Sequence, residues 1–506
     1  MTRSAAEIGA GLAPARAARP IRPGERIHVV GAAGAGASAA ALLAHAAGAA
    51  ASGCDPGGAS PYTAALEAAG IPLAWSHAAA HVGPADAPVV ERLAVTKALT
   101  SVAPDHPELV AARAAGVATE PWQQVIADAA ASQGGRLVAV AGTHGKSTST
   151  GWLVHVLVAA GADPAAFVGA LLPAAVSGGI PATARWGHGS AFVVEADEYA
   201  GNFDPYRPDI AVLLDVEWDH PDVFADETAV RDAFRAWLAA PGAERRTLVA
   251  NVGDPGTARL LAELAGWPGR IVRVALAPEG TAAGEGDGAA DAAVVARLDG
   301  TRFTIDGLGA PLDTRLPLPG RHNAANALCV AVAAAELGLP VDAIAAGLAS
   351  FPGVGRRLEV KGEPRGVLVL DDYGHHPTAI AATLAAVRTT HPGRRVWAVY
   401  EPLTYHRTAA MVDAFADVLA TADEAVVADI WAGRDPDTTI TSADALAAAT
   451  NERGGAPARA TGSVEATADW LATRVRPGDV VLVMGGGRSY VIADRLVATL
   501  SAGRDG

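Results

Sequence analysis

Short runs of apolar, often β-branched residues recur along this chain, and each is followed by a longer segment rich in Ala and Leu. Such runs, bounded by glycine or acidic residues, are typical of buried strands, and the longer segments have the spacing of helices. This alternation predicts α/β domains with mostly parallel sheets. The expected strands are residues 27–30, 137–141, 191–194, 210–214, 367–370, 396–400, 425–428 and 480–483, with helices including 152–159 and 324–337.

The chain length suggests how the alternating segments divide. At 506 residues the chain exceeds one ordinary hydrophobic core, and three α/β units fit its length. We expect domains at residues 25–133, 134–351 and 352–506. Residues 1–24 are rich in Ala, Arg and Pro without an apolar period, which predicts a loosely ordered extension. The Gly-, Ala- and Glu-rich stretch 278–291 predicts a loop.

The charge balance and the cysteines exclude several classes of protein. A net charge of −15 argues against binding to nucleic acid or an anionic membrane, because both need clustered cations. Cys54 and Cys329 are far apart and have no zinc-type spacing, so they read as small core residues in a reducing compartment. The uncharged stretch 27–54 is mostly Ala and Gly rather than large apolar residues, so a cytoplasmic protein is expected rather than a membrane-spanning one.

A glycine loop between a predicted strand and helix carries the first chemical signal. It reads Gly142-Thr143-His144-Gly145-Lys146-Ser147. Backbone N–H groups at such a junction point at an anion, and the helix N-terminus adds positive potential. Lys146 can bind phosphate oxygens and the Ser147 hydroxyl can bind Mg²⁺. Val140 replaces the first glycine of the full phosphate-loop pattern, so a chance Gly-Lys turn stays open.

Acidic residues follow the next two predicted strands. Glu195-Ala196-Asp197-Glu198 follows one, and Asp219-His220 comes soon after the other. Ligands bind at the carboxyl ends of strands in open parallel sheets, and carboxylate with hydroxyl oxygens suits Mg²⁺. The alternative is a solvated acidic loop and a histidine that binds no metal.

Two further regions have the residue types of binding sites. Gly31, Gly34 and Gly36 follow the first strand, and Asp55 stands near the distance of a ribose contact, which indicates diphosphate binding in NAD or a nucleotide sugar. Structural turns also use glycines in this way. The C-terminal half contains three polar motifs. The planar, forked side chain of an arginine in them would suit a substrate carboxylate. They are Arg356-Arg357, Asp371-Asp372-Tyr373-Gly374-His375-His376-Pro377 and Tyr405-His406-Arg407-Thr408.

Taken in order, these motifs resemble those of the Mur ligase family, over more than nine-tenths of the chain. The resemblance also rests on a divergent segment at residues 430–434. The matching motifs are Ile27-His28-Val29-Val30-Gly31 with Gly34-Ala35-Gly36, Ser52-Gly53-Cys54-Asp55, Gly142-Thr143-His144-Gly145-Lys146-Ser147, Glu195-Ala196-Asp197-Glu198, Asp219-His220, Gly320-Arg321-His322-Asn323, Gly353-Val354-Gly355-Arg356-Arg357 and Asp371 to Pro377.

The resemblance implies an architecture and an activity. It implies an N-terminal Rossmann-like domain for a UDP-linked substrate, a central P-loop ATPase-like domain and a C-terminal Rossmann-like domain for an amino acid. The implied enzyme uses ATP and Mg²⁺ to join a small amino acid, L-alanine, to UDP-N-acetylmuramate through an acyl phosphate, in peptidoglycan synthesis. A monomer or homodimer is expected.

The resemblance also assigns roles to individual residues. The implied catalytic residues are Lys146, Glu195, His220, His376 and Arg407. The implied ATP contacts are Gly142, Thr143, His144, Gly145, Lys146, Ser147, Thr148, Asn323, Arg356, Arg357 and Asp372. The implied substrate contacts are Gly31, Gly34, Gly36, Ser52, Asp55, Tyr373, His375, His376 and Arg407, and the implied metal ligands are Ser147, Glu195 and His220.

Several departures from the family pattern leave alternatives open. They are Ala33 and Ala37 in the first loop, Leu214-Asp215, Glu401-Pro402-Leu403 and the C-terminal Gly485–Tyr490 segment. A related recycling ligase that attaches a murein tripeptide, or a ligase of a specialised peptide pathway, would also fit. Alternatives from other classes are a nicotinamide oxidoreductase, which leaves Lys146, Glu195 and His220 unexplained, and a nucleotide-binding regulatory protein without turnover.

Overall fold

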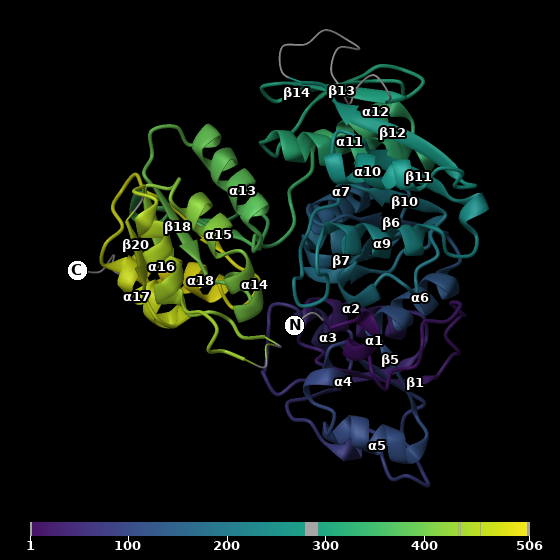
Figure 1. Ribbon diagram of the computed structural model, residues 1–506. Coiled ribbons are helices and arrows are strands. Elements are labelled where there is room, and N and C mark those ends of the chain that lie inside the picture. Colours follow the sequence, from purple (N-terminus) through teal and green to yellow (C-terminus); the bar gives the residue numbers. More distant parts are fainter. Residues whose placement is uncertain (1–2, 279–291, 434, 436, 456, 503–506) are drawn as a thin grey trace. The chain divides into compact units, whose positions relative to one another are not determined.

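The computed structural model describes residues 3–278, 292–433, 435, 437–455 and 457–502 (Figure 1). It separates into two compact units, Met1–Asp219 with Val223–Val354, and His220–Asp222 with Gly355–Gly506. The loop expected at 278–291 lies, apart from Pro278, outside the described residues, as does position 434 of the divergent segment. Among the described residues, none of the helices combines the length and apolar character that a bilayer crossing requires.

The first sheet has five parallel strands in the order β3-β2-β1-β4-β5. Its apolar side chains pack beneath two helices on one face, while a smaller apolar cluster lies under α5. The elements are β1 (Arg26–Val30), β2 (Ala50–Cys54), β3 (Leu73–Ala74), β4 (Arg92–Val95), β5 (Ala118–Pro121), α1 (Ala5–Ile8), α2 (Ala35–Ala46), α3 (Ala64–Ala68), η1 (Ala79–His81), α4 (Leu99–Val102), α5 (Pro107–Ala115) and α6 (Trp122–Gln133).

A ten-stranded sheet forms the rest of the first unit, in the order β15-β14-β13-β12-β11-β10-β6-β9-β7-β8. One of its faces shares a continuous core with the first sheet, and the other is covered by α7, α11 and α12. Its strands are β6 (Arg136–Ala141), β7 (Ala165–Leu172), β8 (Ala182–Arg185), β9 (Ala191–Ala196), β10 (Ile210–Leu213), β11 (Thr247–Asn251), β12 (Arg270–Leu276), β13 (Val294–Asp299), β14 (Arg302–Asp306) and β15 (Leu312–Arg315). Its helices are α7 (Lys146–Ala159), α8 (Ala174–Ser177), η2 (Tyr199–Gly201), α9 (Glu227–Leu238), η3 (Ala243–Arg245), α10 (Pro255–Glu263), α11 (Arg321–Glu336) and α12 (Val341–Ala349).

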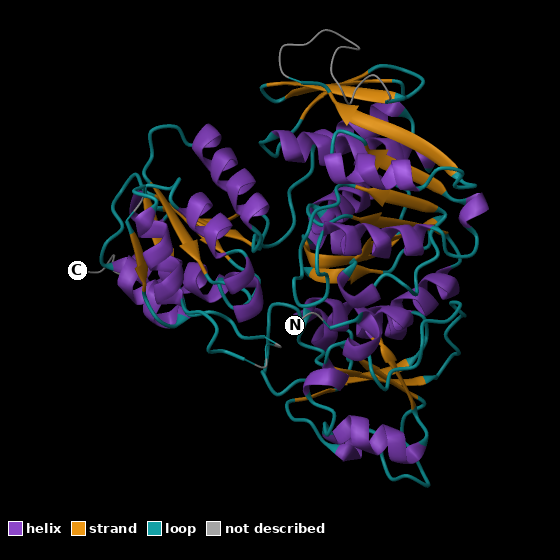
Figure 2. Ribbon diagram, viewed as in Figure 1, coloured by secondary structure: helices purple, strands orange, loops and turns teal. Residues whose placement is uncertain are grey.

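The second unit contains a six-stranded sheet in the order β16-β17-β21-β18-β19-β20, flanked by helices (Figure 2). Only β16, at an edge, is antiparallel to its neighbour. The elements are β16 (Glu359–Gly362), η4 (Pro364–Gly366), β17 (Leu368–Asp372), α13 (Pro377–Thr390), β18 (Val396–Tyr400), α14 (Tyr405–Ala410), α15 (Val412–Leu419), β19 (Glu424–Val427), α16 (Ala443–Glu452), β20 (Ala458–Ala460), α17 (Val464–Ala472), β21 (Val480–Met484) and α18 (Tyr490–Ala502).

The predicted α/β class with mostly parallel sheets is confirmed. Every strand expected from the sequence is present, within two residues at each end. The strands β13 to β15, β8 and β16, each of which forms at least one antiparallel pair, were not predicted, since they lie at or near sheet edges and carry weak apolar patterns. Cys54 and Cys329 are buried and unbridged, as expected for core residues.

Residues 3–24 of the N-terminal extension pack against the first unit, so the expectation of a loosely ordered segment is wrong for them. Ile8 and Ile21 are buried in the first unit. Nη2 of Arg16 lies 2.6 Å from Oδ2 of Asp128, a carboxylate with no exposed surface. Arg19 pairs in the same way with buried Glu25. A buried carboxylate is costly without a cation, so the arginines of this segment are tied to the domain by charge, which a search for apolar periodicity does not detect.

Candidate functional site

The phosphate-type loop connects β6 to α7, and its backbone has the geometry that the motif requires. Gly142 and Gly145 have φ angles of 149° and 74°, in the left-handed region that glycine adopts without strain. A Cβ on Gly145 would also come within 2.8 Å of Asn326 Nδ2. Gly145 is the N-cap of α7 and has no side chain to cap it, so the first N–H groups of the helix face the loop.

Lys146 folds back over this loop. Its Nζ donates hydrogen bonds to the carbonyl of Gly142 at 2.7 Å and to Oε2 of Glu198 at 2.8 Å. Asp197 Oδ1 lies 3.4 Å from the same nitrogen. Burial opposes the charge of Lys146, but Glu198 and Asp197 outweigh it and hold its pKa above the ordinary value. The ammonium group is therefore a fixed positive charge at the loop.

Ser147 and Glu195 meet beside Lys146. The Ser147 hydroxyl donates a hydrogen bond to Oε1 of Glu195 at 3.0 Å, and the backbone N–H of Gly169 donates to Oε2 at 2.7 Å. A Cβ on Gly169 would lie 2.7 Å from the Glu195 carboxylate, so only glycine permits this approach. A hydroxyl and a carboxylate together are the oxygen donors that suit Mg²⁺. The predicted metal ligands Ser147 and Glu195 are thus brought together.

Two acidic residues that follow β10, Asp215 and Glu217, form hydrogen bonds with the phosphate-type loop and were not predicted as site residues. Oδ1 of Asp215 accepts the backbone N–H of His144 at 2.7 Å, and Glu217 Oε2 lies 2.7 Å from His144 Nε2. Burial raises the pKa of Asp215 to about 6, although His144 partly offsets the effect. The hydroxyl of Thr143 donates to the carbonyl of Glu217 at 3.0 Å. Acidic residues directly after a buried strand were the available signal.

The remaining predicted ATP contacts of the first unit lie near the loop or on neighbouring helix surfaces. Thr148 is buried in the first turn of α7. Asn323 lies in the first turn of α11, which packs against α7, and its Nδ2 donates to the carbonyl of Pro319 at 2.7 Å. Their contacts with a nucleotide stay predictions.

The first glycine loop follows β1, at the carboxyl edge of the five-stranded sheet. Gly31 has a φ of 77°, and Gly34 is the N-cap of α2. Asp55 accepts the Ala33 N–H at 3.2 Å, so it joins the two loops of this edge. Gly36 has a packing reason of its own, because a Cβ there would lie 2.3 Å from the ring of Trp122.

Ser52, also predicted as a substrate contact, bonds inside the first sheet. Its hydroxyl lies 2.8 Å from Nδ1 of His28 on the neighbouring strand. The other substrate contacts predicted for this domain stay predictions.

In the second unit, the side chain of Arg356 is buried and forms several hydrogen bonds. Its guanidinium donates to the Asp371 carboxylate at 3.2 Å, to the Gly485 carbonyl at 2.8 Å and to the Ser489 hydroxyl at 2.7 Å. Burial raises the pKa of Asp371 to about 6, although Arg356 opposes the effect. These contacts engage Arg356 within its own unit, and Arg357 beside it is half-buried; the nucleotide contacts expected for the two arginines stay predictions.

The histidine-containing loop after β17 is ordered by local bonds. Asp372 accepts the N–H of Gly374 at 2.7 Å and that of Leu358 at 2.9 Å. Nδ1 of His375 lies 3.0 Å from the Tyr373 carbonyl. His376 is the N-cap of α13 and accepts the N–H of Thr378 at 3.3 Å. The motif therefore places its side chains at the carboxyl edge of the sheet, as expected for a binding loop.

Arg407 lies in the short helix α14 and is buried, with 3% of its surface exposed. Its Nη2 lies 3.1 Å from Nδ1 of His220, which belongs to the segment His220–Asp222 grouped with the same unit. His220 itself has a φ of 55°, an uncommon conformation for a residue with a Cβ. The predicted roles of His220 in metal binding and of Arg407 in amino-acid binding stay predictions.

The departures at the end of β18 lie together. Glu401 is 3% exposed, and its Oε2 has no hydrogen-bond partner among the described residues. Burial raises its pKa to about 7, partly offset by the backbone N–H groups of Ser489 and Arg488. Leu403 forms a backbone bridge with Trp431. An apolar wall and a buried carboxyl thus border this edge.

Comparison with protein families places each part of the chain. Residues 26–133 match the model described as Mur ligase family, catalytic domain, residues 140–334 match the Mur ligase middle domain, and residues 356–487 match the Mur ligase, glutamate ligase domain. The chain is 36% identical over 490 residues to a UDP-N-acetylmuramate–L-alanine ligase of Roseiflexus, covering 94% of this chain and 98% of the relative. A ligase of the same name from Kineococcus radiotolerans is 38% identical over 487 residues, covering 94% and 96%.

Solved structures share the fold over nearly the whole chain. The UDP-N-acetylmuramate-alanine ligase of Thermotoga maritima superposes with a TM-score of 0.73 at 23% identity, covering 95% of this chain and all of that one. A murein peptide ligase from Psychrobacter arcticus superposes with a TM-score of 0.71 at 25% identity, covering 94% and 99%. With three family models matching in chain order and relatives aligned over nearly its full length, this chain belongs to the Mur ligase family.

Proposed function

We propose that this protein is an ATP-dependent ligase that joins L-alanine to the carboxylate of UDP-N-acetylmuramate, releasing ADP and phosphate. The observation that carries the proposal is the cluster at the start of α7, where Lys146, Ser147 and Glu195 gather at a glycine loop. A fixed cation, a helix N-terminus and a hydroxyl–carboxylate pair are what a nucleoside triphosphate with Mg²⁺ requires.

The chain's residues divide the work of binding. The N–H groups at the N-terminus of α7 and the ammonium group of Lys146 hold the terminal phosphates of ATP. Ser147 and Glu195 would hold one Mg²⁺ ion and His220 a second, and bound Mg²⁺ would neutralise the phosphate charge. Residues 25–133 bind the UDP-sugar through the first glycine loop, and residues 352–506 bind the amino acid.

The chemistry follows from the poor reactivity of a carboxylate towards amines. The muramate carboxylate oxygen attacks the γ-phosphorus of ATP, the bond to the β-phosphate oxygen breaks, and an acyl phosphate with ADP results. The neutral amine of alanine then attacks the acyl carbon, and the tetrahedral intermediate expels phosphate and loses a proton to give the amide. Arg407 orients the amino acid by binding its carboxylate, since a guanidinium fork matches that group.

A second candidate is the addition of a murein tripeptide to the same UDP-sugar. The motifs Glu401-Pro402 and Asp222-Val223-Phe224 favour it, and Glu401 departs from the residue that the alanine-adding pattern has near the amino-acid pocket. The two candidates share the ATP chemistry and differ only in the nucleophile.

The decisive experiment measures ADP release by the purified protein with ATP, Mg²⁺ and UDP-N-acetylmuramate. We expect release to require the UDP-sugar and an added nucleophile, with L-alanine preferred over glycine, serine and L-alanyl-γ-D-glutamyl-meso-diaminopimelate. Preference for the tripeptide would establish the second candidate. Rapid ATP hydrolysis without either acceptor, or oxidation of NADH, would contradict both.

A further inference from the structure

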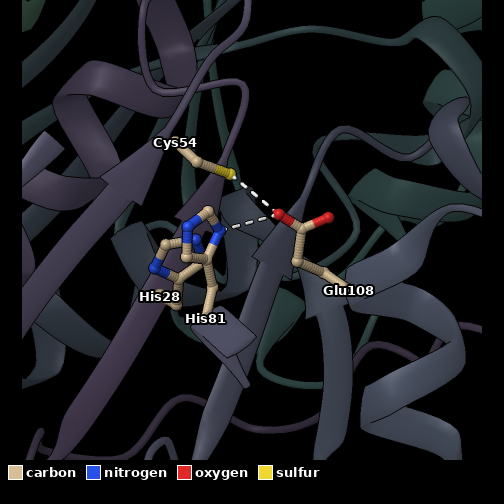
Figure 3. A group of neighbouring side chains, drawn as sticks. All are labelled: His28, Cys54, His81 and Glu108. Carbon is tan, nitrogen blue, oxygen red and sulfur yellow. Dashed lines mark hydrogen bonds and ion pairs between the residues drawn. The ribbon is translucent and has the colours of Figure 1, made fainter. Parts of the chain in front are cut away.

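Four of the chain's histidines gather on one face of the five-stranded sheet, away from the phosphate loop, together with Cys54 and Glu108. His28 lies on β1, Cys54 ends β2, His81 ends η1 and Glu108 begins α5 (Figure 3). These four side chains each offer one donor atom, and the donor atoms all lie within 4.8 Å of one another. Segments separated by up to 80 residues thus bring nitrogen, sulfur and oxygen donors to one point.

Most of the cluster is buried, and the His81 side chain is 19% exposed. Cys54 and Glu108 have no exposed surface, and His28 is 3% exposed. Val30, Leu93 and Leu109 belong to the apolar cluster around them. Polar groups in such a place are costly unless each is bonded, so the collection of polar side chains needs a physical reason.

The imidazole of His28 has a hydrogen-bond partner at only one of its two nitrogens among the described residues. Its Nδ1 lies 2.8 Å from the Ser52 hydroxyl, whereas its Nε2 is buried and has no hydrogen-bond partner among the described residues. Burial, aided by neighbouring His81, lowers the pKa of His28 to about 4, so the ring is neutral near pH 7. A neutral imidazole held through one nitrogen and unpaired at the other has the arrangement of a metal ligand.

The carboxylate of Glu108 contacts other polar groups of the cluster. Its Oε1 accepts hydrogen bonds from Cys54 Sγ at 3.3 Å and from the Ala78 N–H at 3.0 Å, and it lies 2.9 Å from His81 Nδ1 (Figure 3). Burial opposes ionisation of Glu108, but the bonds from His81, Ala78 and Cys54 outweigh it and lower its pKa. Glu108 is therefore an anion enclosed by hydrogen-bond donors, two of which, Cys54 and His81, are also metal-ligating side chains.

We propose that His28, Cys54, His81 and Glu108 form a closed binding site for one Zn²⁺ ion. Two neutral imidazoles with one thiolate and one carboxylate give four ligands of the types that Zn²⁺ binds tetrahedrally. The two negative ligands cancel the charge of the ion, which makes its burial among apolar residues feasible. Mg²⁺ is unsuited, since it requires oxygen ligands and retains water.

Binding has a defined proton balance. An ordinary cysteine thiol has a pKa of about 8.5, so the Cys54 side chain carries its proton near pH 7 before the metal arrives. The bond between sulfur and Zn²⁺ replaces the S–H bond, and one proton leaves for the solvent.

His77 and His106 form an outer layer. His77 Nδ1 lies 3.3 Å from Cys54 Sγ, and His106 Nδ1 lies 2.8 Å from Glu108 Oε2. The two rings pack edge to face with centroids 4.2 Å apart. These two histidines and Glu108 form a smaller group that lacks the thiolate, so we assign His77 and His106 as positioning residues beside the cysteine and the glutamate.

A metal ion bound at this site would restrict the movement of the first glycine loop. The Cys54 carbonyl accepts the N–H groups of Gly31 at 2.8 Å and of Ala32 at 3.1 Å. A metal bond at the Cys54 side chain fixes this residue and, with it, the loop. The site is thus structural, and its ligands come from four separate elements.

The test uses the full-length protein, stripped with a chelator and titrated with Zn²⁺ against a chromophoric competitor. We expect one Zn²⁺ per chain, release of about one proton in weak buffer, and a rise in Tm. Co²⁺ in place of Zn²⁺ should give a thiolate charge-transfer band. No tight binding, or a Co²⁺ spectrum without that band, would overturn the proposal on the wild-type protein alone.

Variants then identify the ligands, with folding checked by circular dichroism. Cys54→Ser should abolish the thiolate band and lower Zn²⁺ affinity by more than about 100-fold, whereas Cys329→Ala, at the other buried thiol, should leave both unchanged. His81→Gln should weaken binding as strongly, with exposed His45→Gln as its control. Undiminished binding by folded Cys54→Ser would refute the site, and loss of binding in His77→Gln but not in His28→Gln would refute this ligand set.

Discussion

The Ser147 hydroxyl donates a hydrogen bond to Oε1 of Glu195 over 3.0 Å, which joins the first turn of α7 to β9 of the central sheet. The opposite oxygen of the carboxylate accepts the N–H of Gly169. Glu195 is therefore held in place before any ligand binds, and a preorganised donor set of this kind loses little freedom when it takes up a cation.

Glu195→Gln should lower the rate of amide formation by about 10²–10³-fold, because it removes one negative charge from a preorganised site while keeping its shape. The measurement is ADP release with saturating substrates. Exposed Glu67→Gln serves as the matched control and should turn over normally. Near-normal activity of folded Glu195→Gln would remove this residue from the metal site.

Lys146→Ala should reduce turnover by a similar factor, about 10²–10³-fold, because a buried cation at the phosphate loop is lost. Its loss also leaves the buried Glu198 carboxylate without its 2.8 Å partner, so stability must be measured alongside activity. Lys361→Ala, which breaks an ion pair with Asp494 on the second unit, is the control for losing a lysine. Full activity of Lys146→Ala would mean that backbone N–H groups alone hold the phosphates.

Arg407→Lys should raise the KM for every accepted amino acid, because lysine cannot reproduce the planar fork that binds a carboxylate. Leu403→His should instead change the preference among alanine, serine and glycine while leaving the KM for ATP unchanged. Steady-state kinetics with each amino acid measures both effects. If Arg407→Lys disturbs only ATP binding, Arg407 belongs to the nucleotide site.

Glu401→Gln should change the pH dependence of stability. Burial raises the pKa of Glu401 from its ordinary 4.5 to about 7. Between these values the folded protein keeps a proton that the unfolded chain has lost, so the free energy of unfolding falls as pH rises through this window. The free energy of unfolding of Glu401→Gln does not fall in this way. Relative to that of the native protein, it should therefore increase by up to roughly 3 kcal/mol from pH 4.5 to 8. Parallel urea titrations of the two proteins at these pH values would reveal a constant difference if Glu401 titrates normally.

Arg16→Ala should lower the free energy of unfolding by about 1–2 kcal/mol. The reason is that buried Asp128 loses two charged hydrogen bonds from Arg16, while its hydrogen bond with Arg92 remains. Arg235→Ala removes an exposed pair with Asp232 and should cost at most a few tenths. Urea unfolding measures both. Equal small effects would show that the N-terminal segment contributes nothing to stability.

The sequence determined the class of fold and the order of its motifs. Val138 and Val140, like Val481 and Val483, are fully or almost fully buried, so the apolar runs that contain them identify central strands without knowledge of their neighbours. The left-handed glycines of the phosphate loop were equally readable, since backbone conformation restricts the residue type locally. Strands near a sheet edge such as β14, which lies next to the edge strand β15, carry alternating polar residues, and their pairing depends on partners that the local sequence does not specify.

Only the tertiary structure decided which distant side chains meet. Asp215 bonds to His144 across 71 residues, and Arg16 bonds to Asp128 across 112. Cys54 has no zinc-type spacing to other ligands in the sequence, yet it lies beside His28, His81 and Glu108 because β1, β2, η1 and α5 meet on one face of a sheet. A local pattern reports the conformation of its own segment, whereas a binding site depends on distances between segments, and those distances are set by how the strands pair and the helices pack.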